Sequence, residues 1–201
     1  MTNHGSGPTR KETTLSEARS YHNLAVANNY FGLLGNADPV APSRILLEER
    51  ALDSYYNILF SIVEFWRTHA VWPKQLTLVS HAFKQTRLVD GHCAAIGFPL
   101  HRVTFVGIDP PGVEDLDRSR EGQVSDKASA MRGVQLTMGQ WEIDPHGVGE
   151  ELARKRRQRN CWGADQRLFF THEERARSNI STRTLEDGTE ALMEGIAHLG
   201  P

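Results

Sequence analysis

Three polar segments of the chain carry the residue types that bind, and can act on, an anionic small molecule. They lie at residues 5–18, 48–57 and 80–87, and each leads into a predicted helix. Backbone N–H groups at a helix N-terminus bind phosphate or carboxylate groups, and Lys84 and Arg87 add positive charge. The pattern predicts a ligand pocket at the place where the three segments meet.

Each of these features also has a purely structural interpretation, and both interpretations stay open at this point. Three of the polar residues are types that cap helices: Ser16, Asp53 and Ser54. His81 can carry a proton, because the ordinary pKa of histidine is ~6.5, but it fits a hydrogen bond within a turn equally well. The two basic residues of the third segment are three positions apart and fit one exposed helix face.

The elements that must position these residues follow from the apolar pattern. Strands are predicted at three short apolar runs: 44–48, 75–79 and 102–108. Helices are predicted at five segments: from Thr14 or Ser16 onward, from Asp53 or Ser54 to about His69, 82–96, 147–160 and 182–198. Because this alternation is typical of βαβ units, we predict an α/β fold, a three-layer Rossmann-like parallel sheet flanked by helices. In such sheets ligands bind beyond the carboxyl ends of the strands, where the polar segments fall.

The chain is predicted to divide into an α/β core at residues 1–111 and an irregular C-terminal extension at residues 112–201. The extension begins with a long loop at 112–140, and we expect its helices to pack on the same domain. The basic run at 154–159 is interpreted as a solvated helix face in preference to a phosphate or nucleic-acid site.

Composition argues against several function classes. The 23 basic and 25 acidic residues give a formal charge of −2, so no nucleic-acid partner is expected. Cys93 and Cys161 have no CxxC spacing and the histidines show no HxH or HExxH spacing, so no metal site is predicted. The polar N-terminus and the lack of an apolar run of ~18 to 20 residues predict a cytoplasmic protein without a signal peptide or a membrane span.

The order and spacing of the polar segments resemble the SanA/ElyC/YdcF-like family over roughly residues 5–110. The residues that carry the resemblance are Ser6-Gly7, Ser16-Glu17-Ala18, the segment from Glu48 to Asn57, and the segment from Val79 to Lys84 together with Arg87. Two further stretches are similar to a fungal branch of this family: Thr104 to Pro111 and Lys155 to Asn160.

The chain departs from the family pattern at several positions. Pro8 follows the Ser-Gly pair, and Tyr56 stands where the family has a glutamate. Asp53 and Ser54 replace the usual Asn-Thr, which keeps polar capping atoms and adds a charge. The family has a further strand before the Ser-Gly loop, so we expect a sheet truncated at its N-terminal side with an exposed edge.

The resemblance implies a nucleotide-like or adenosyl ligand, with S-adenosylmethionine as the candidate cofactor. In the implied catalytic set, Glu17 and Glu48 contact ribose hydroxyls or act as a general base, and His81 meets an anionic group or carries a proton. The expected ligand contacts are Ser6, Gly7, Thr9, Ser16, Arg50, Asp53, Ser54, Asn57, Ser80, Lys84 and Arg87.

The favoured function is therefore the binding of a nucleotide-like, adenosyl or other anionic small molecule at the carboxyl ends of the strands, with catalysis there left open. The alternative is a non-catalytic interaction or scaffold protein, or a truncated and inactive family member. In that case the loop 112–140 and the basic run 154–159 would be the working surfaces. The sequence identifies no reaction and no oligomeric state.

Overall fold

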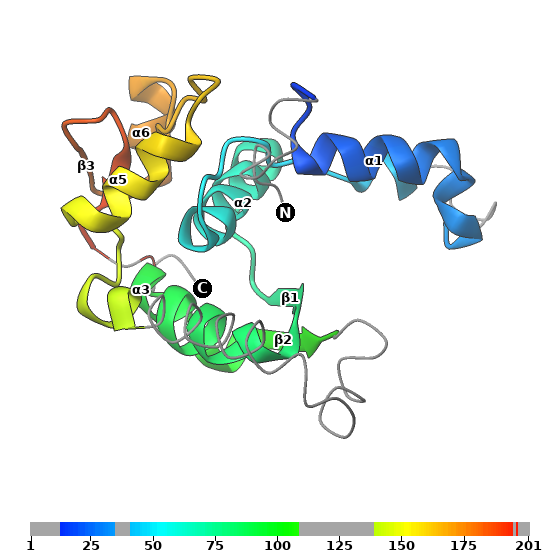
Figure 1. The fold of residues 1–201 in the computed structure, drawn as a ribbon, viewed down its shortest axis with the longest axis horizontal. Coiled ribbons are helices and arrows are strands. Elements are labelled where there is room, and N and C mark those ends of the chain that lie inside the picture. The colour runs from blue at the N-terminus through cyan, green and yellow to red at the C-terminus, as the bar shows by residue number, and fades with distance from the viewer. Residues whose placement is uncertain (1–12, 35–40, 109–138, 195, 197–201) are drawn as a thin grey trace, which may run out of the picture.

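The computed structural model describes residues 13–34, 41–108, 139–194 and 196 (Figure 1). The helices are α1 (Glu17–Ala27), α2 (Ser54–His69), α3 (Ala94–Ile96), α5 (Glu150–Arg159) and α6 (His172–Ser178), and residues 139–143 are also helical. The strands are β1 (Leu76–Ser80), β2 (Val103–Gly107), β3 (Thr182–Thr184) and β4 (Glu190–Leu192). Short 3-10 helices are η2 (Asn29–Gly32), η3 (Ala41–Arg44), η4 (Ala82–Lys84) and η6 (Leu100–Arg102), and η5 (Arg87–Cys93) is a π-helix.

Helix α2 is the centre of the hydrophobic core. It begins as predicted, because the Asp53 side chain accepts the backbone N–H of Tyr56 at 2.9 Å, and it ends where Ala70 takes a left-handed conformation with φ 56°. Its apolar residues cover more than one face, so it is buried among other elements. Residues from the described part of the chain after position 138 pack on the same core as α2: Trp141, Leu152, Leu168, Phe169, Ile180, Leu192 and Ile196.

Strands β1 and β2 form the parallel pair that the sequence predicts. Their register runs from Leu76 opposite Val103 to Ser80 opposite Gly107. The connection between them is helical from residue 82 to residue 96, as predicted for a βαβ unit. The carboxyl ends of both strands therefore lie at one edge, beside the start of η4.

The described residues form two two-stranded sheets, and two predicted elements are wrong. The strand predicted at 44–48 does not form: Arg44 ends η3, and neither sheet offers residues 45–48 a neighbouring strand whose backbone could pair with them. The terminal helix predicted at 182–198 is wrong over its described part, because 182–192 form the antiparallel hairpin β3–β4 instead. Gly188 turns this hairpin with φ 79°, a conformation that favours glycine.

Helix α1 projects from the rest of the molecule (Figure 1). Ser16 caps it by accepting the N–H of Arg19 at 2.9 Å, which confirms the predicted start. Ser16 and Arg19 also anchor the helix, since each bonds the Glu49 carboxylate at 2.7 Å. The larger apolar side chains of this helix are exposed, with Leu24 at 54% and Val26 at 48%, and Phe31 just beyond it is 62% exposed. Within the described ranges, no helix is both long and apolar enough to cross a membrane.

Candidate functional site

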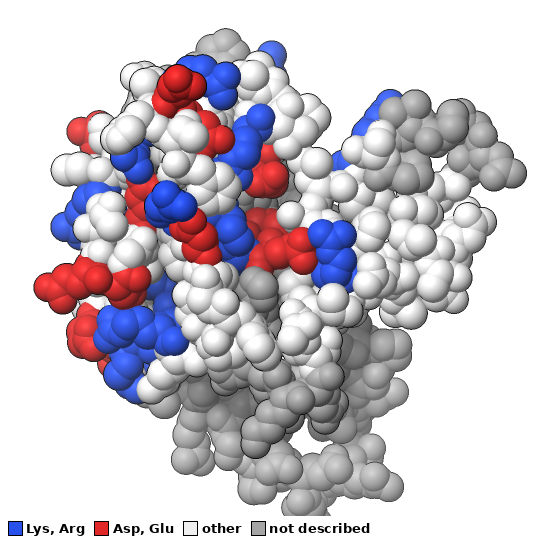
Figure 2. All heavy atoms as spheres, turned by 90° about the horizontal axis from the view of Figure 1, so that it is seen from above, with Lys and Arg blue, Asp and Glu red and all other residues white. Residues whose placement is uncertain are grey.

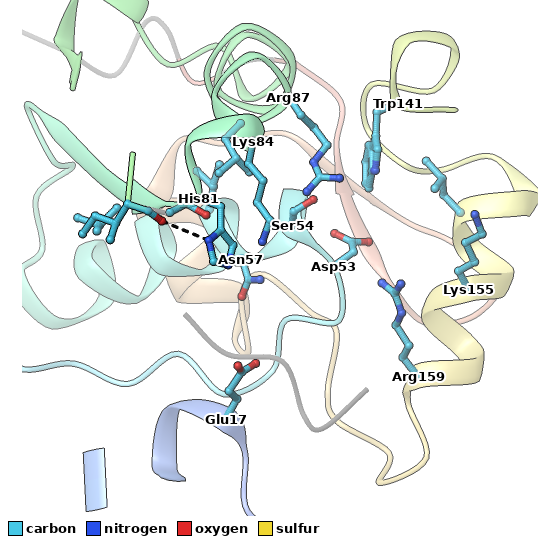
Figure 3. A pocket seen from close by; sticks show the side chains of 16 residues that line it. Glu17, Asp53, Ser54, Asn57, His81, Lys84, Arg87, Trp141, Lys155 and Arg159 are labelled. Atoms are coloured by element: carbon cyan, nitrogen blue, oxygen red, sulfur yellow. Dashed lines mark hydrogen bonds between the residues drawn. The ribbon is translucent and has the colours of Figure 1, made fainter. Parts of the chain in front are cut away.

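A cavity of about 560 Å³ opens at the carboxyl ends of β1 and β2 (Figure 3). The N-terminus of α2, the segment after β1 and one face of α5 form its walls. Eight residues predicted from the three polar segments line it: Glu17, Asp53, Ser54, Asn57, Ser80, His81, Lys84 and Arg87. The structure thus brings together side chains from all three segments.

The α2 wall is fixed by a buried ion pair. One carboxylate oxygen of Asp53 caps the helix, and the other lies 3.3 Å from Nη1 of Arg156. Burial raises the pKa of Asp53, and the neighbouring guanidinium opposes that rise. Both carboxylate oxygens of Asp53 are therefore used in holding α2 and α5 together. The next residue, Ser54, lines the cavity.

Ser54 has a partner that the sequence analysis did not connect with it. Its hydroxyl oxygen lies 2.9 Å from Nε2 of His92, a histidine that is only 1% exposed. The His92 ring is held edge-on against Trp141, with ring centroids 4.5 Å apart. Burial, and secondarily the charge of Arg87, lower the pKa of His92 to about 3, so this ring is neutral near pH 7.

The β1–β2 wall closes tightly against the start of η4. His81 Nδ1 lies 3.2 Å from the carbonyl oxygen of Ile108, and its ring stacks on Phe83. Gly107 permits this closure, because a Cβ atom there would lie 2.9 Å from the Cα and Cβ atoms of Ala82. In this arrangement His81 ties the strand ends together while its side chain lines the cavity.

Arg87 and Lys84 supply positive charge to the cavity, and neither forms an ion pair with another of the described residues. Within the described part of the chain, the Arg87 guanidinium makes no hydrogen bond or ion pair, and its Nε is buried without a partner. Burial lowers the pKa of Arg87. Burial, and then Arg87, lower the pKa of Lys84, while Glu17 acts in the opposite direction. These shifts express the cost of removing cations from water.

Helix α5 contributes the third wall, and here the interpretation of the basic run as a solvated face is only partly right. Lys155 and Arg159 line the cavity, and Arg156 is 1% exposed. Lys155 Nζ donates to Oε1 of Gln140 at 2.6 Å, and Arg159 donates to the carbonyl oxygen of Leu52 at 2.9 Å. The sequence signal that could have indicated this wall is the spacing of residues 152, 155 and 159, which places them on one face of a helix.

Three predicted site residues do not line this cavity. Glu48 accepts the backbone N–H groups of Arg50 at 2.7 Å and Ala51 at 3.1 Å, and so forms a turn before α2. Arg50 donates to the carbonyl oxygen of Arg167 at 2.6 Å and lies over the ring of Phe60. Ser16 serves α1 as its cap. Three more predicted contacts lie outside the described residues: Ser6, Gly7 and Thr9.

The charges that line the cavity favour an anion. Four side chains are basic: Lys84, Arg87, Lys155 and Arg159. Among the described residues of the lining only Glu17 and Asp53 are acidic, and Asp53 is already paired with Arg156. Trp141 and five aliphatic residues add apolar surface beside these charges: Ile58, Val79, Leu88, Ile108 and Leu152. A ligand with one anionic end and one flat or apolar end suits such a lining.

Comparison with known proteins gives one relative. Over 66 residues the chain is 38% identical to the uncharacterized protein YOR238W of Saccharomyces cerevisiae. The match covers 33% of this chain and 22% of the yeast protein, so it spans about a fifth of that relative. The chain matches no family model and no solved structure.

Proposed function

We propose that the cavity binds an anionic small molecule, with its phosphate or carboxylate group against Arg87 and Lys84. The observation that carries this proposal is the Arg87 guanidinium, which faces the cavity without a counter-ion among the described residues. A partly buried cation without a partner is unfavourable, because it loses water without gaining a hydrogen-bonded anion. A bound anion would remove this cost, and a bidentate contact to a guanidinium is specific for phosphate and carboxylate.

The other end of the ligand is proposed to be nucleotide-like. The volume of about 560 Å³ suits a molecule of nucleotide size. Trp141 lines the cavity as an aromatic contact for a base, and the Glu17 carboxylate is an acceptor for ribose hydroxyls. S-adenosylmethionine is included among the candidates, since it combines an adenosine group with a carboxylate.

Membership of the SanA/ElyC/YdcF-like family, with its Rossmann-like sheet, is part of the same proposal. It is supported by the parallel β1–β2 pair and by the cavity at the carboxyl ends of these strands. It is also supported by the meeting of the three polar segments that carry the resemblance. A cytoplasmic location is proposed with it.

Thermal unfolding of the purified chain tests the proposal. The melting temperature is measured with inorganic phosphate, AMP and S-adenosylmethionine at concentrations up to ~100 times the dissociation constant. At that ratio a ligand stabilises the native state by about 2.7 kcal/mol, or about 5 to 11 °C for a chain of this size.

The decisive comparison uses two variants with the same change of charge. Arg87→Met removes the proposed anion contact and should abolish the ligand-induced shift. Arg154→Met alters an exposed position of α5 and should keep it. If none of the three compounds raises the melting temperature, or if both variants respond equally, the proposal is wrong.

A second candidate function is an interaction protein, and one observation favours it. The apolar side chains of α1 and its continuation are exposed, and Leu33 is 83% exposed. Figure 2 shows few charged side chains over the part of the surface that α1 forms, on the right of that view. An affinity pull-down that loses a partner in Leu24→Asp but not in Arg154→Met would support this candidate.

A further inference from the structure

We propose that Ser54 is a nucleophile and His92 its general base, for acyl transfer from an ester that carries an anionic group. The requirement for an anionic group rests on the proposed function, whereas the pairing of Ser54 with His92 stands independently of it. Serine becomes a nucleophile when its hydroxyl is accessible to a substrate and lies within hydrogen-bond reach of an imidazole nitrogen that can take its proton.

The pair is built with the base buried and the nucleophile accessible. Ser54 Oγ lines the cavity, and Nε2 of His92 lies 2.9 Å from it on the core side. Trp141 and Tyr55 contact the His92 ring edge-on, with centroid distances of 4.5 Å and 5.8 Å. These aromatic contacts restrict the orientation of the ring, so its nitrogen stays directed at the hydroxyl.

The π-helix η5 explains how one segment supplies both the base and the anion contact. Arg87 and His92 are five residues apart, and in an α-helix such residues point about 140° away from each other. The wider i→i+5 turn of a π-helix brings them towards the same side. Figure 3 shows the Arg87 guanidinium and the Ser54 hydroxyl directed into the same space. π-Helical turns are frequent at functional sites for such reasons.

The charge state of His92 suits a base that becomes stronger when the substrate binds. The neutral ring can accept a proton at Nε2 when its hydrogen is on Nδ1, and Nδ1 has no hydrogen-bond partner in the described residues. Burial is the larger cause of the low pKa of His92, and the charge of Arg87 is the second. An anionic group bound to Arg87 cancels that contribution and therefore raises the proton affinity of the ring.

The N-terminus of α2 provides the complementary site for negative charge that develops in the reaction. The N–H of Tyr56 is taken by Asp53, but the first-turn N–H groups of Ser54 and Tyr55 have no intrahelical partner. They lie beside the hydroxyl that would attack. A carbonyl oxygen placed there gains hydrogen bonds as it becomes an oxyanion.

The reaction balances with an ester and water. Ser54 Oγ forms a bond to the ester carbonyl carbon while its proton moves to Nε2 of His92. The bond from that carbon to the alcohol oxygen then breaks, and the proton moves from His92 to the leaving alkoxide, which leaves an acyl-serine. Water adds to the acyl carbon with its proton taken by His92, and the carboxylic acid leaves as Ser54 regains the proton.

Labelling with diisopropyl fluorophosphate tests the pair separately from anion binding, because this probe is uncharged. We expect one phosphorylated serine by mass spectrometry, at Ser54. Ser54→Ala should abolish labelling, and His92→Gln should slow it by about 10² to 10⁴-fold, the usual contribution of a general base. Ser61→Ala, an exposed serine on the same helix, should label at the original rate. Circular dichroism melts establish that each variant is folded.

Two chromogenic esters test the anionic requirement. The chain should hydrolyse 4-nitrophenyl hemisuccinate in preference to 4-nitrophenyl acetate, and Arg87→Met should reduce that preference at least about tenfold. If folded protein is not labelled at Ser54, or if His92→Gln labels at the original rate, the inference is overturned even where phosphate or AMP raises the melting temperature. If labelling occurs but Arg87→Met leaves ester preference unchanged, the anionic part is overturned.

Discussion

Replacing Asp53 with asparagine should expose the cost of an isolated buried cation. Asparagine keeps the helix cap, because its side-chain oxygen can still accept the N–H of Tyr56. It removes the negative charge that faces Arg156, whose side chain is 1% exposed and whose Nε and Nη2 have no other partner in the described residues. The substitution therefore separates the ion pair from the cap.

The expected loss is about 3 to 5 kcal/mol, the range for removing one partner of a buried ion pair. Asp53→Ala should cost about 1 kcal/mol more, since it also removes the cap. With a urea m-value of about 2 kcal/mol/M, Asp53→Asn should lower the urea midpoint by about 2 M. Urea unfolding followed by circular dichroism measures this directly.

The double variant Asp53→Asn/Arg156→Met provides the control. It removes the unpaired charge, and it should recover most of the stability lost in the single variant. A loss below about 1 kcal/mol in Asp53→Asn, or a double variant less stable than the single one, would refute the view that this pair holds α2 against α5.

Two further predictions concern the strand ends and the buried histidine. Gly107→Ala should lower stability by about 1 to 3 kcal/mol, because the added Cβ meets the backbone of Ala82 at 2.9 Å, and a thermal melt that is unchanged from the original chain would contradict this. The native pKa of His92, about 3, lies below its ordinary value of ~6.5, so its contribution to stability is complete above ~6.5 and is lost as the pH falls towards 3. The loss of stability approaches about 1.4 kcal/mol per pH unit within that window. Urea midpoints measured at pH 7, 5 and 4 should therefore fall less steeply in His92→Gln than in the original chain. Equal falls in both proteins would contradict this assignment to His92.

Local signals in the sequence predicted the elements around the cavity. The helix caps at Ser16 and Asp53 could be predicted from the residue types at the start of each helix, and the structure confirms both. The strands at 76–80 and 103–107 were predictable because each is a short apolar run between turn signals. Since parallel strands end at one edge, their polar continuations could be expected to meet there.

Features that depend on distant partners could not be predicted in this way. Residues 45–48 have the composition of a strand, but a strand also requires a neighbour, and none of the described strands lies beside them. Arg156 is buried because Asp53, 103 residues earlier, faces it. His92 is a candidate site residue because it contacts Ser54, 38 residues away, and because it lies in a π-helix that no local sequence pattern predicts.

The π-helix has a consequence for how this cavity tolerates changes in chain length. A π-helical turn holds one more residue than the α-helical turn that it replaces, so the loss of a single residue between 87 and 92 would restore an ordinary helix. Such a deletion would put Arg87 and His92 four positions apart, and in an α-helix that spacing keeps both side chains on the same face. Relatives one residue shorter in this segment are therefore expected to keep Arg87 and His92 on one side, whereas a relative of unchanged length with an ordinary α-helix here would separate them.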